Sequence, residues 1–289
     1  MDDLSIYFPP LAIQAGLTCL TAHVVLALVF RFVLPKGPWT SLPNSTAHQV
    51  VCLPLMMYLV YHGWIAWFTE QDELYAAGMT GRIFGLSPRG TEMSATVWGM
   101  MWFWDIPLSF FVPALQNHLM LAHHLGMCFV SGVSMGAFSN GYPIGSYYAA
   151  FFYGIVEISS SFLTIVDMFH PKNKAWFEYV SQTKTPLGQM VQSLNEFSRV
   201  AFAVTFLVLR CGMFPYVMFT TCLNDFWTAA MVDDAERHGI DRWVLLLVCA
   251  LCFGFTFLQL NWGLLVARQV AKAIGLIPDK KEKAETKTD

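Results

Sequence analysis

The chain alternates between long apolar stretches and short polar connections. Seven stretches approach the roughly 20 consecutive apolar residues that a helix needs to cross a bilayer. They lie at about 11–33, 47–68, 94–113, 119–138, 145–167, 197–220 and 242–268. Because lipid offers no hydrogen-bond partners to the backbone, runs of this length are predicted to be helices. The pattern therefore predicts an all-α, polytopic membrane protein with seven transmembrane helices.

Composition supports this prediction. The 289 residues are 55% hydrophobic and only 13% charged, whereas roughly 25% of the residues in a soluble domain are charged. The net charge is −3, and no basic cluster precedes the C-terminal tail. We therefore expect membrane lipids as partners and no nucleic acid, and nothing in the sequence indicates an oligomeric state.

The distribution of charge predicts how the chain is oriented. An odd number of spans places the two termini on opposite sides of the membrane. Lys and Arg are more frequent in the connections on the side of the C-terminal tail, and this bias predicts a cytosolic C-terminus and a lumenal or external N-terminus. The glycosylation sequon Asn44-Ser45-Thr46 then lies in the cytosol, where it should stay unmodified.

Ionisable residues inside predicted spans usually face a bundle interior or a watery cavity. Asp105 lies in the third span, and His123 and His124 lie in the fourth, all in the half that we expect to face the cytosol. An imidazole oriented by a carboxylate is a general base, and an imidazole can also accept an acyl group. We therefore take these three residues as candidate catalytic residues. Neighbouring residues point about 100° apart on a helix, so one histidine should face the cavity.

Further polar residues occupy the fifth and sixth spans. Glu157, Ser160, Ser161 and Thr164 recur at the spacing of one helix face, and helix packing is the favoured interpretation of the hydroxyl residues. The following are nevertheless candidate substrate-binding residues: Glu157, Ser161, Thr164, Asp167 and Asn195. Together with the histidines and Asp105, they are predicted to gather in one leaflet.

Several known chemistries do not fit these positions. A retinal protein needs a lysine deep in the last span, and WVLLLVCALCFGFTFLQLNWGLLVAR contains none. Seven-span zinc hydrolases need further histidines in late spans, and di-iron desaturases need several histidine boxes. We therefore predict no metal site and no resident cofactor. Acyl-CoA, a cytosolic donor with a lipid tail, is a candidate co-substrate.

Five segments resemble TLC-domain proteins in their order and spacing. They are WDIPLSFF, AHHLGM, EISSSFL, LNEFSRVAFAVTFLVLRCGMFPY and LQLNWGLLVARQV. The family includes ceramide synthases, translocon-associated TRAM proteins and lipid-homeostasis proteins. The resemblance implies a barrel-like bundle of six helices around a lipid-accommodating cavity, with one additional N-terminal helix. It divides the chain into an N-terminal region with the first helix (1–44), a TLC domain (45–272) and a charged cytosolic tail (273–289).

The resemblance also implies functional residues. His123 and His124 are similar to the histidine pair that ceramide synthases need for N-acyl transfer, and Asp105 is similar to the aspartate of the preceding family helix. Arg210, near Pro215, resembles a family arginine and joins the candidate substrate-binding residues. After the histidine pair, the chain departs from ceramide synthases: Glu157 stands where those enzymes have a His-Asp pair. The chain is closer to the TLC-domain-containing branch, and similar to its member 4.

These observations lead to one expected function and two alternatives. We expect a multi-pass protein of the endoplasmic reticulum or a connected membrane that binds a long-chain lipid or acyl group and acts in membrane lipid homeostasis. The first alternative is an acyl-CoA-dependent N-acyltransferase that uses His123 and His124. The second is a non-catalytic trafficking or translocon accessory protein. Whether the protein is an enzyme stays open at this stage.

Overall fold

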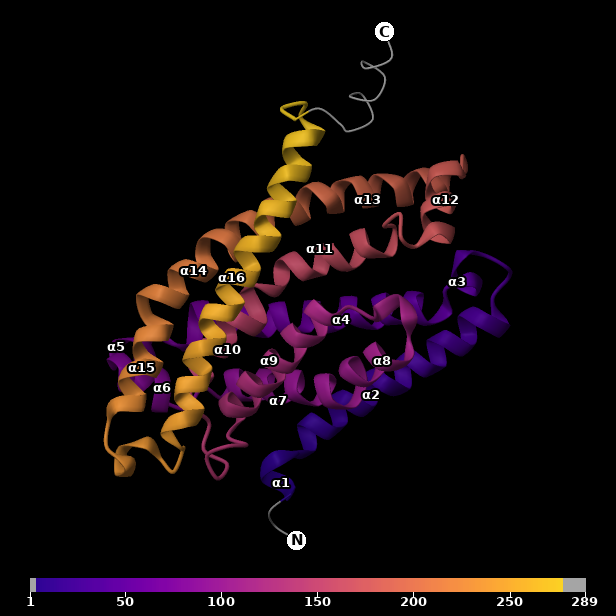
Figure 1. Ribbon diagram of the computed structural model, residues 1–289. Coiled ribbons are helices and arrows are strands. Elements are labelled where there is room, and N and C mark those ends of the chain that lie inside the picture. The colour runs from indigo at the N-terminus through magenta and orange to yellow at the C-terminus, as the bar shows by residue number, and fades with distance from the viewer. Residues whose placement is uncertain (1–3, 278–289) are drawn as a thin grey trace.

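The computed structural model describes residues 4–277, and the regular structure in this range is helical. Seven long segments, some containing π-helical turns (η), follow the predicted spans (Figure 1). They are α2 (Pro10–Leu28) with η1 (Val29–Val33); α4 (Pro43–Ile65) with η2 (Ala66–Glu70); α7 (Pro88–Met100), η3 (Met101–Asp105) and α8 (Ile106–Phe111); α9 (His118–Met135); α10 (Ser146–Ala150), η5 (Phe151–Ile155) and α11 (Glu157–Met168); α13 (Pro186–Thr205), η6 (Phe206–Met213), α14 (Phe214–Val217), η7 (Met218–Cys222) and α15 (Leu223–Met231); and α16 (Arg242–Ala273).

Short elements connect the long segments. They are α1 (Leu4–Tyr7), α3 (Pro38–Ser41), α5 (Asp72–Ala76), α6 (Gly78–Phe84), the 3-10 turn η4 (Pro113–Leu115), α12 (Lys174–Gln182) and the 3-10 turn η8 (Asp234–Arg237). The greater part of the predicted cytosolic tail, residues 278–289, lies outside the described residues.

The connections gather at two opposite ends of the bundle. At one end, Trp39 of α3 packs against Trp176 of α12 with ring centroids 5.9 Å apart. At the other end, His238 stacks on Tyr142 at 4.2 Å and lies 5.2 Å from Phe84. Connections from alternate segments thus meet at the same end, as expected for a chain that crosses from end to end seven times.

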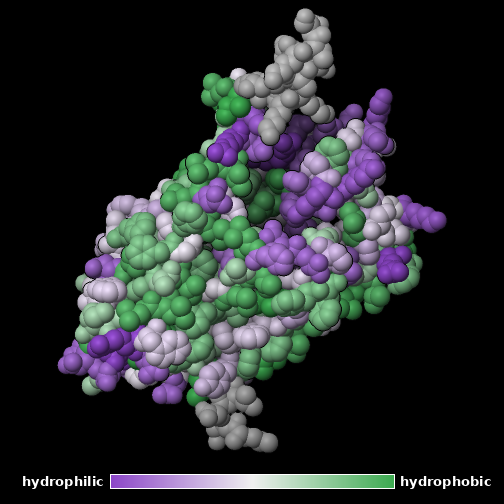
Figure 2. Space-filling view, in the orientation of Figure 1, coloured by the Kyte–Doolittle hydropathy of each residue, from purple (hydrophilic) through white to green (hydrophobic). Residues whose placement is uncertain are grey.

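The surface of the bundle fits a membrane. Five segments are long and apolar enough to cross a bilayer by length and composition, namely α2–η1, α4–η2, α10–α11, the α13–α15 segment and α16. The other two predicted spans, α7–α8 and α9, are helices that carry more polar residues. Figure 2 shows hydrophobic residues over the middle of the visible face and hydrophilic residues gathered toward its lower left and upper right. The prediction of an all-α polytopic membrane protein is confirmed.

Glycines allow some helices to approach very closely. A Cβ atom added to Gly63 of α4 would lie 2.4 Å from the Cα of Gly154 in η5, and one added to Gly99 of α7 would lie 1.8 Å from the carbonyl oxygen of Ala12 in α2. Small residues at helix interfaces permit such backbone contact in membranes. The N-terminal helix α2 therefore packs directly on the helices that follow it.

The sixth segment is longer than the predicted span 197–220, because its helix begins at Pro186 and ends at Met231. Thr185 caps its start by accepting a hydrogen bond from the backbone N–H of Gly188 at 3.2 Å. The first turns read QMVQSLNEFSR, and their polar residues keep the hydropathy low although the backbone is helical. Hydropathy therefore located the apolar middle of this segment and missed both ends.

Candidate functional site

A cavity lies between α9, α10–α11, the α13–α15 segment and α16. Two of its walls are single stripes at helical spacing. They are His123, Met127, Val130 and Ser134 on α9, and Val248, Cys252, Phe255 and Gln259 on α16. The first and last residues of each stripe are eleven positions apart, or roughly 16 Å at 1.5 Å per residue. The cavity is therefore long and narrow.

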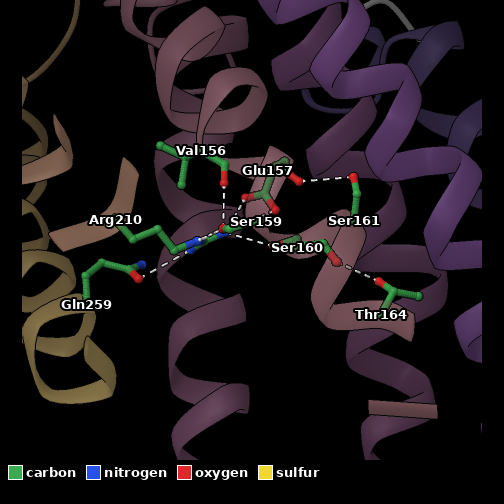
Figure 3. Close-up of polar contacts among 8 residues, drawn as sticks. All are labelled: Val156, Glu157, Ser159, Ser160, Ser161, Thr164, Arg210 and Gln259. Atoms are coloured by element: carbon green, nitrogen blue, oxygen red, sulfur yellow. Dashed lines mark hydrogen bonds and ion pairs between the residues drawn. The ribbon is translucent and has the colours of Figure 1, made fainter. Parts of the chain in front are cut away.

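Polar side chains gather at one end of this cavity, around Arg210. The Arg210 guanidinium donates hydrogen bonds to Glu157 Oε1 at 3.1 Å, Ser159 Oγ at 2.7 Å, Ser160 Oγ at 2.8 Å and Gln259 Oε1 at 3.4 Å. In Figure 3, Arg210 reaches across to α11 while Gln259 approaches from α16. Three segments far apart in sequence are thus tied together by one buried guanidinium.

The local backbone explains how charged residues reach the interior. Arg210 is the fifth residue of η6, five residues before Pro215, and Asp105 ends η3 two residues before Pro107. Proline lacks an N–H and its ring displaces the preceding turn, so the helix widens there. Glu157 likewise follows the end of η5 by two residues. Such π-helical turns are frequently found at functional sites.

The Arg210 group lies deeper than the cytosolic leaflet in which we expected it. Glu157 is at the middle of the segment Ser146–Met168, and Gln259 is near the middle of α16. Asp167, by contrast, lies at the end of α11, where it contacts Lys172 Nζ at 2.6 Å and accepts a hydrogen bond from Gln49 at 2.8 Å. The predicted polar residues therefore occupy two depths rather than one.

The remaining predicted residues of α11 and α13 do not join this group. The Ser161 hydroxyl donates to the Glu157 carbonyl oxygen at 3.2 Å, and that of Thr164 donates to the Ser160 carbonyl oxygen at 2.9 Å. Figure 3 shows both on the side of α11 away from Arg210. Asn195 is partly buried on α13 and does not line the cavity. The helix-packing interpretation therefore describes Ser161 and Thr164, whereas Ser160 reaches Arg210.

Asp105 forms a second buried polar group with two histidines. Its carboxylate accepts a hydrogen bond from His48 Nε2 at 2.9 Å and is in direct contact with Nδ1 of His124. The His48 ring stacks on Trp104 with centroids 4.8 Å apart. Asp105 is only 5% exposed, and its two oxygens face His48 and His124 rather than water. Of the two predicted histidines, Asp105 contacts His124, and its second partner is His48.

The two adjacent histidines point in different directions. His124 contacts Asp105, while His123 lines the cavity and packs edge-on against Phe255 and Trp262, with centroids 5.4 and 5.5 Å away. Nδ1 of His123 is buried without a hydrogen-bond partner. The rings of the two histidines are 5.7 Å apart. The imidazole that faces the cavity is therefore not the one that the carboxylate holds.

Sequence reasoning missed several members of both groups. His48 lies at the edge of a predicted span, and only the fold brings it to Asp105. Gln259 is an amide within the apolar run of the last span. A polar residue in such a run could have been recognised as a candidate site residue. Ser159 lies one position off the helix face that carries Glu157 and Ser160, yet it makes the shortest hydrogen bond to Arg210.

The charges at the polar end of the cavity compensate each other. Glu157 and Arg210 form an ion pair whose side chains are 10% and 8% exposed. Burial of one charge without the other is costly, so the pair is expected to stay together. What the cavity presents at this end is a neutral set of donors and acceptors, including the unpartnered nitrogen of His123. The rest of the wall is mainly apolar.

Comparison with known proteins gives one match. The family model described as the TLC domain matches residues 39–268. No curated protein and no solved structure matches the chain. The match includes both polar groups and every helix that lines the cavity, and it begins after α2.

Proposed function

The chain belongs to the TLC-domain family of membrane proteins, and from this premise we propose that it binds a long-chain lipid or acyl group in its cavity and acts in membrane lipid homeostasis. The observation that carries the proposal is the shape and polarity of that cavity. A long apolar channel with polar side chains at one end matches a molecule with an apolar chain and a polar head.

The ion pair between Glu157 and Arg210 indicates which head group of a bound lipid fits the polar end of the cavity. A carboxylate beside Arg210 would also meet the Glu157 carboxylate, so the ion pair offers it little net attraction. An amide, ester or thioester carbonyl needs only a hydrogen-bond donor. Arg210, Gln259 and His123 supply donors at this end of the cavity. We therefore infer an uncharged acyl group as the preferred head.

The expected membrane and orientation belong to the same proposal. The endoplasmic reticulum or a connected membrane, with the C-terminus in the cytosol, places the connection between α8 and α9 on the cytosolic side. His123 then lies one to two turns below that surface, within reach of lipids that enter from the cytosolic leaflet.

Lipid mass spectrometry of the protein purified in detergent tests lipid binding. The wild-type protein should retain a lipid, and Cys252→Phe, which places a ring inside the cavity, should lose it. Leu260→Phe is the matched control, because Leu260 is 43% exposed on the same helix. Equal retention by Cys252→Phe and the wild type would show that any bound lipid lies elsewhere on the protein.

The contact between Asp105 and His124 favours one further candidate function, acyl-CoA-dependent N-acyl transfer. The cavity-facing imidazole can take a proton from an amine that attacks the thioester carbonyl, with the carboxylate-held imidazole beside it. As the C–N bond forms, the C–S bond breaks, and the departing CoA thiolate takes up the proton. Incubation with acyl-CoA should then leave a covalent acyl adduct or an N-acyl product that His123→Ala with His124→Ala abolishes. Lipid retained unchanged by that double variant favours binding alone, and absence of any lipid from the wild type favours a trafficking or translocon accessory role.

A further inference from the structure

The cavity ends, opposite Arg210, at a buried polar group that closes it. The lining residues at this end include Gly145, Tyr148 and Phe226. The Tyr148 hydroxyl donates a hydrogen bond to Asp225, and Arg82 of α6 donates two to the same carboxylate at 2.6 and 2.9 Å. We name Arg82, Tyr148, Asp225 and Phe226 the closing group.

The closing group is held in place from several sides. Asp225 is 1% exposed, and its hydrogen bonds raise the pKa of the Arg82 guanidinium above its ordinary value. Arg82 also lies over the ring of Tyr75, 5.5 Å from its centroid. A buried bidentate pair between Arg and a carboxylate has a fixed geometry. The tyrosine ring at the end of the cavity is therefore anchored rather than free to swing aside.

The neighbouring backbone closes the remaining space. Gly145 has a φ of +69° and donates its N–H to the Ile83 carbonyl oxygen at 2.7 Å. A Cβ atom at this position would lie 2.5 Å from the Phe226 ring, so the ring rests directly on the glycine. Phe226 is 3% exposed and lies 6.2 Å from Tyr148, measured between ring centroids. Two aromatic rings and a backbone turn thus form the wall.

From this geometry we propose that the closing group sets the maximum length of the lipid chain that the cavity accepts. The inference rests on the proposed lipid binding and adds a specificity determinant to it. The distance from the polar end to the closing group, roughly 16 Å along α9, is about half the thickness of the hydrocarbon core. A chain that starts near His123 therefore meets Tyr148 and Phe226 before it leaves the bundle.

Four segments line the path from the polar end to the closing group, and α9 and α16 each contribute one stripe of residues. Because the proposed limit acts on the length of a chain that lies along this path, a single-chain lipid with an uncharged head is the probe that measures it.

The test uses the full-length protein in detergent and an equimolar series of saturated monoacylglycerols, from medium to very long chains. Native mass spectrometry then measures which chain lengths stay bound. The wild type should show an upper limit. Tyr148→Ala removes the ring and should move the limit to longer chains, whereas Tyr148→Phe keeps the ring without its hydroxyl and should keep the wild-type limit.

A variant of opposite effect keeps the proposal testable if Tyr148→Ala fails to fold. Val248→Phe adds bulk where the α16 stripe reaches the closing group, and should move the limit to shorter chains. Retention of all lengths alike by the wild type would overturn the proposal while leaving lipid binding intact, and so would an unchanged limit in Val248→Phe. A wild type that retains no member of the series and no native lipid contradicts lipid binding itself, and the inference falls with it.

Discussion

Removal of the Arg210 charge should lower the unfolding free energy of the protein substantially. Arg210→Met leaves the Glu157 carboxylate near the middle of the membrane without its partner, and leaves acceptors on Ser159 and Ser160 without their donor. Loss of one partner from a buried ion pair typically costs about 3–5 kcal/mol of unfolding free energy. Both side chains are at most 10% exposed, so solvent supplies little compensation. We expect a loss in this range.

A double-mutant cycle separates the ion pair from other effects of the substitution. Replacing both charges, with Glu157→Gln and Arg210→Met, removes the uncompensated carboxylate and should recover most of the loss, which gives a coupling free energy of about 2–3 kcal/mol. Reversible unfolding in bicelles measures the four proteins. The control is Arg199→Met on the exposed side of α13, which should change stability by about 0.5 kcal/mol or less. If the double variant loses as much unfolding free energy as the two single variants together, the buried ion pair does not stabilise the fold as argued here.

Three further outcomes follow from the structure. Asp105→Asn replaces a charged acceptor of two histidine contacts and should lower the unfolding free energy by about 1.5–3 kcal/mol, which the same bicelle assay measures. Gly63→Leu forces α4 away from Gly154 and should lower the thermal midpoint, whereas Gly254→Leu, where nothing lies within 4 Å, should not. Asn44 should stay unglycosylated in eukaryotic cells, so endoglycosidase treatment should leave the electrophoretic mobility unchanged; a shift would invert the predicted orientation.

Hydrophobic pattern alone predicted the helices because membrane burial makes every long apolar run a helix. It was least accurate where polar residues continue a helix beyond the apolar region, as at both ends of the segment Pro186–Met231. The hydrophobic pattern also does not predict which helices approach each other closely. The contacts of Gly63 and Gly99 depend on which helices pack together, and the sequence around a glycine does not reveal which residue of another helix it will contact.

The charged residues of the candidate site could be predicted from the sequence, but the residues that they contact on other helices could not. An Asp, a Glu or an Arg inside an apolar span is conspicuous because burial is costly, so Asp105, Glu157 and Arg210 were found. Their partners His48 and Gln259 belong to other helices, and contact across helices depends on rotation and depth. Serines of α11 differ by 100° per residue, which is why Ser160 reaches Arg210 while Ser161 does not.

The separation of His123 from His124 bears most directly on function. A base that works on a bound lipid must both reach it and be able to pass its proton onward. His123 reaches the cavity without a carboxylate, and His124 has the carboxylate of Asp105 without lining the cavity. Transfer chemistry therefore requires the two rings, 5.7 Å apart, to act in succession through a bridging group or a small rotation. Lipid binding requires neither, because an apolar channel and uncharged donors already suffice for it.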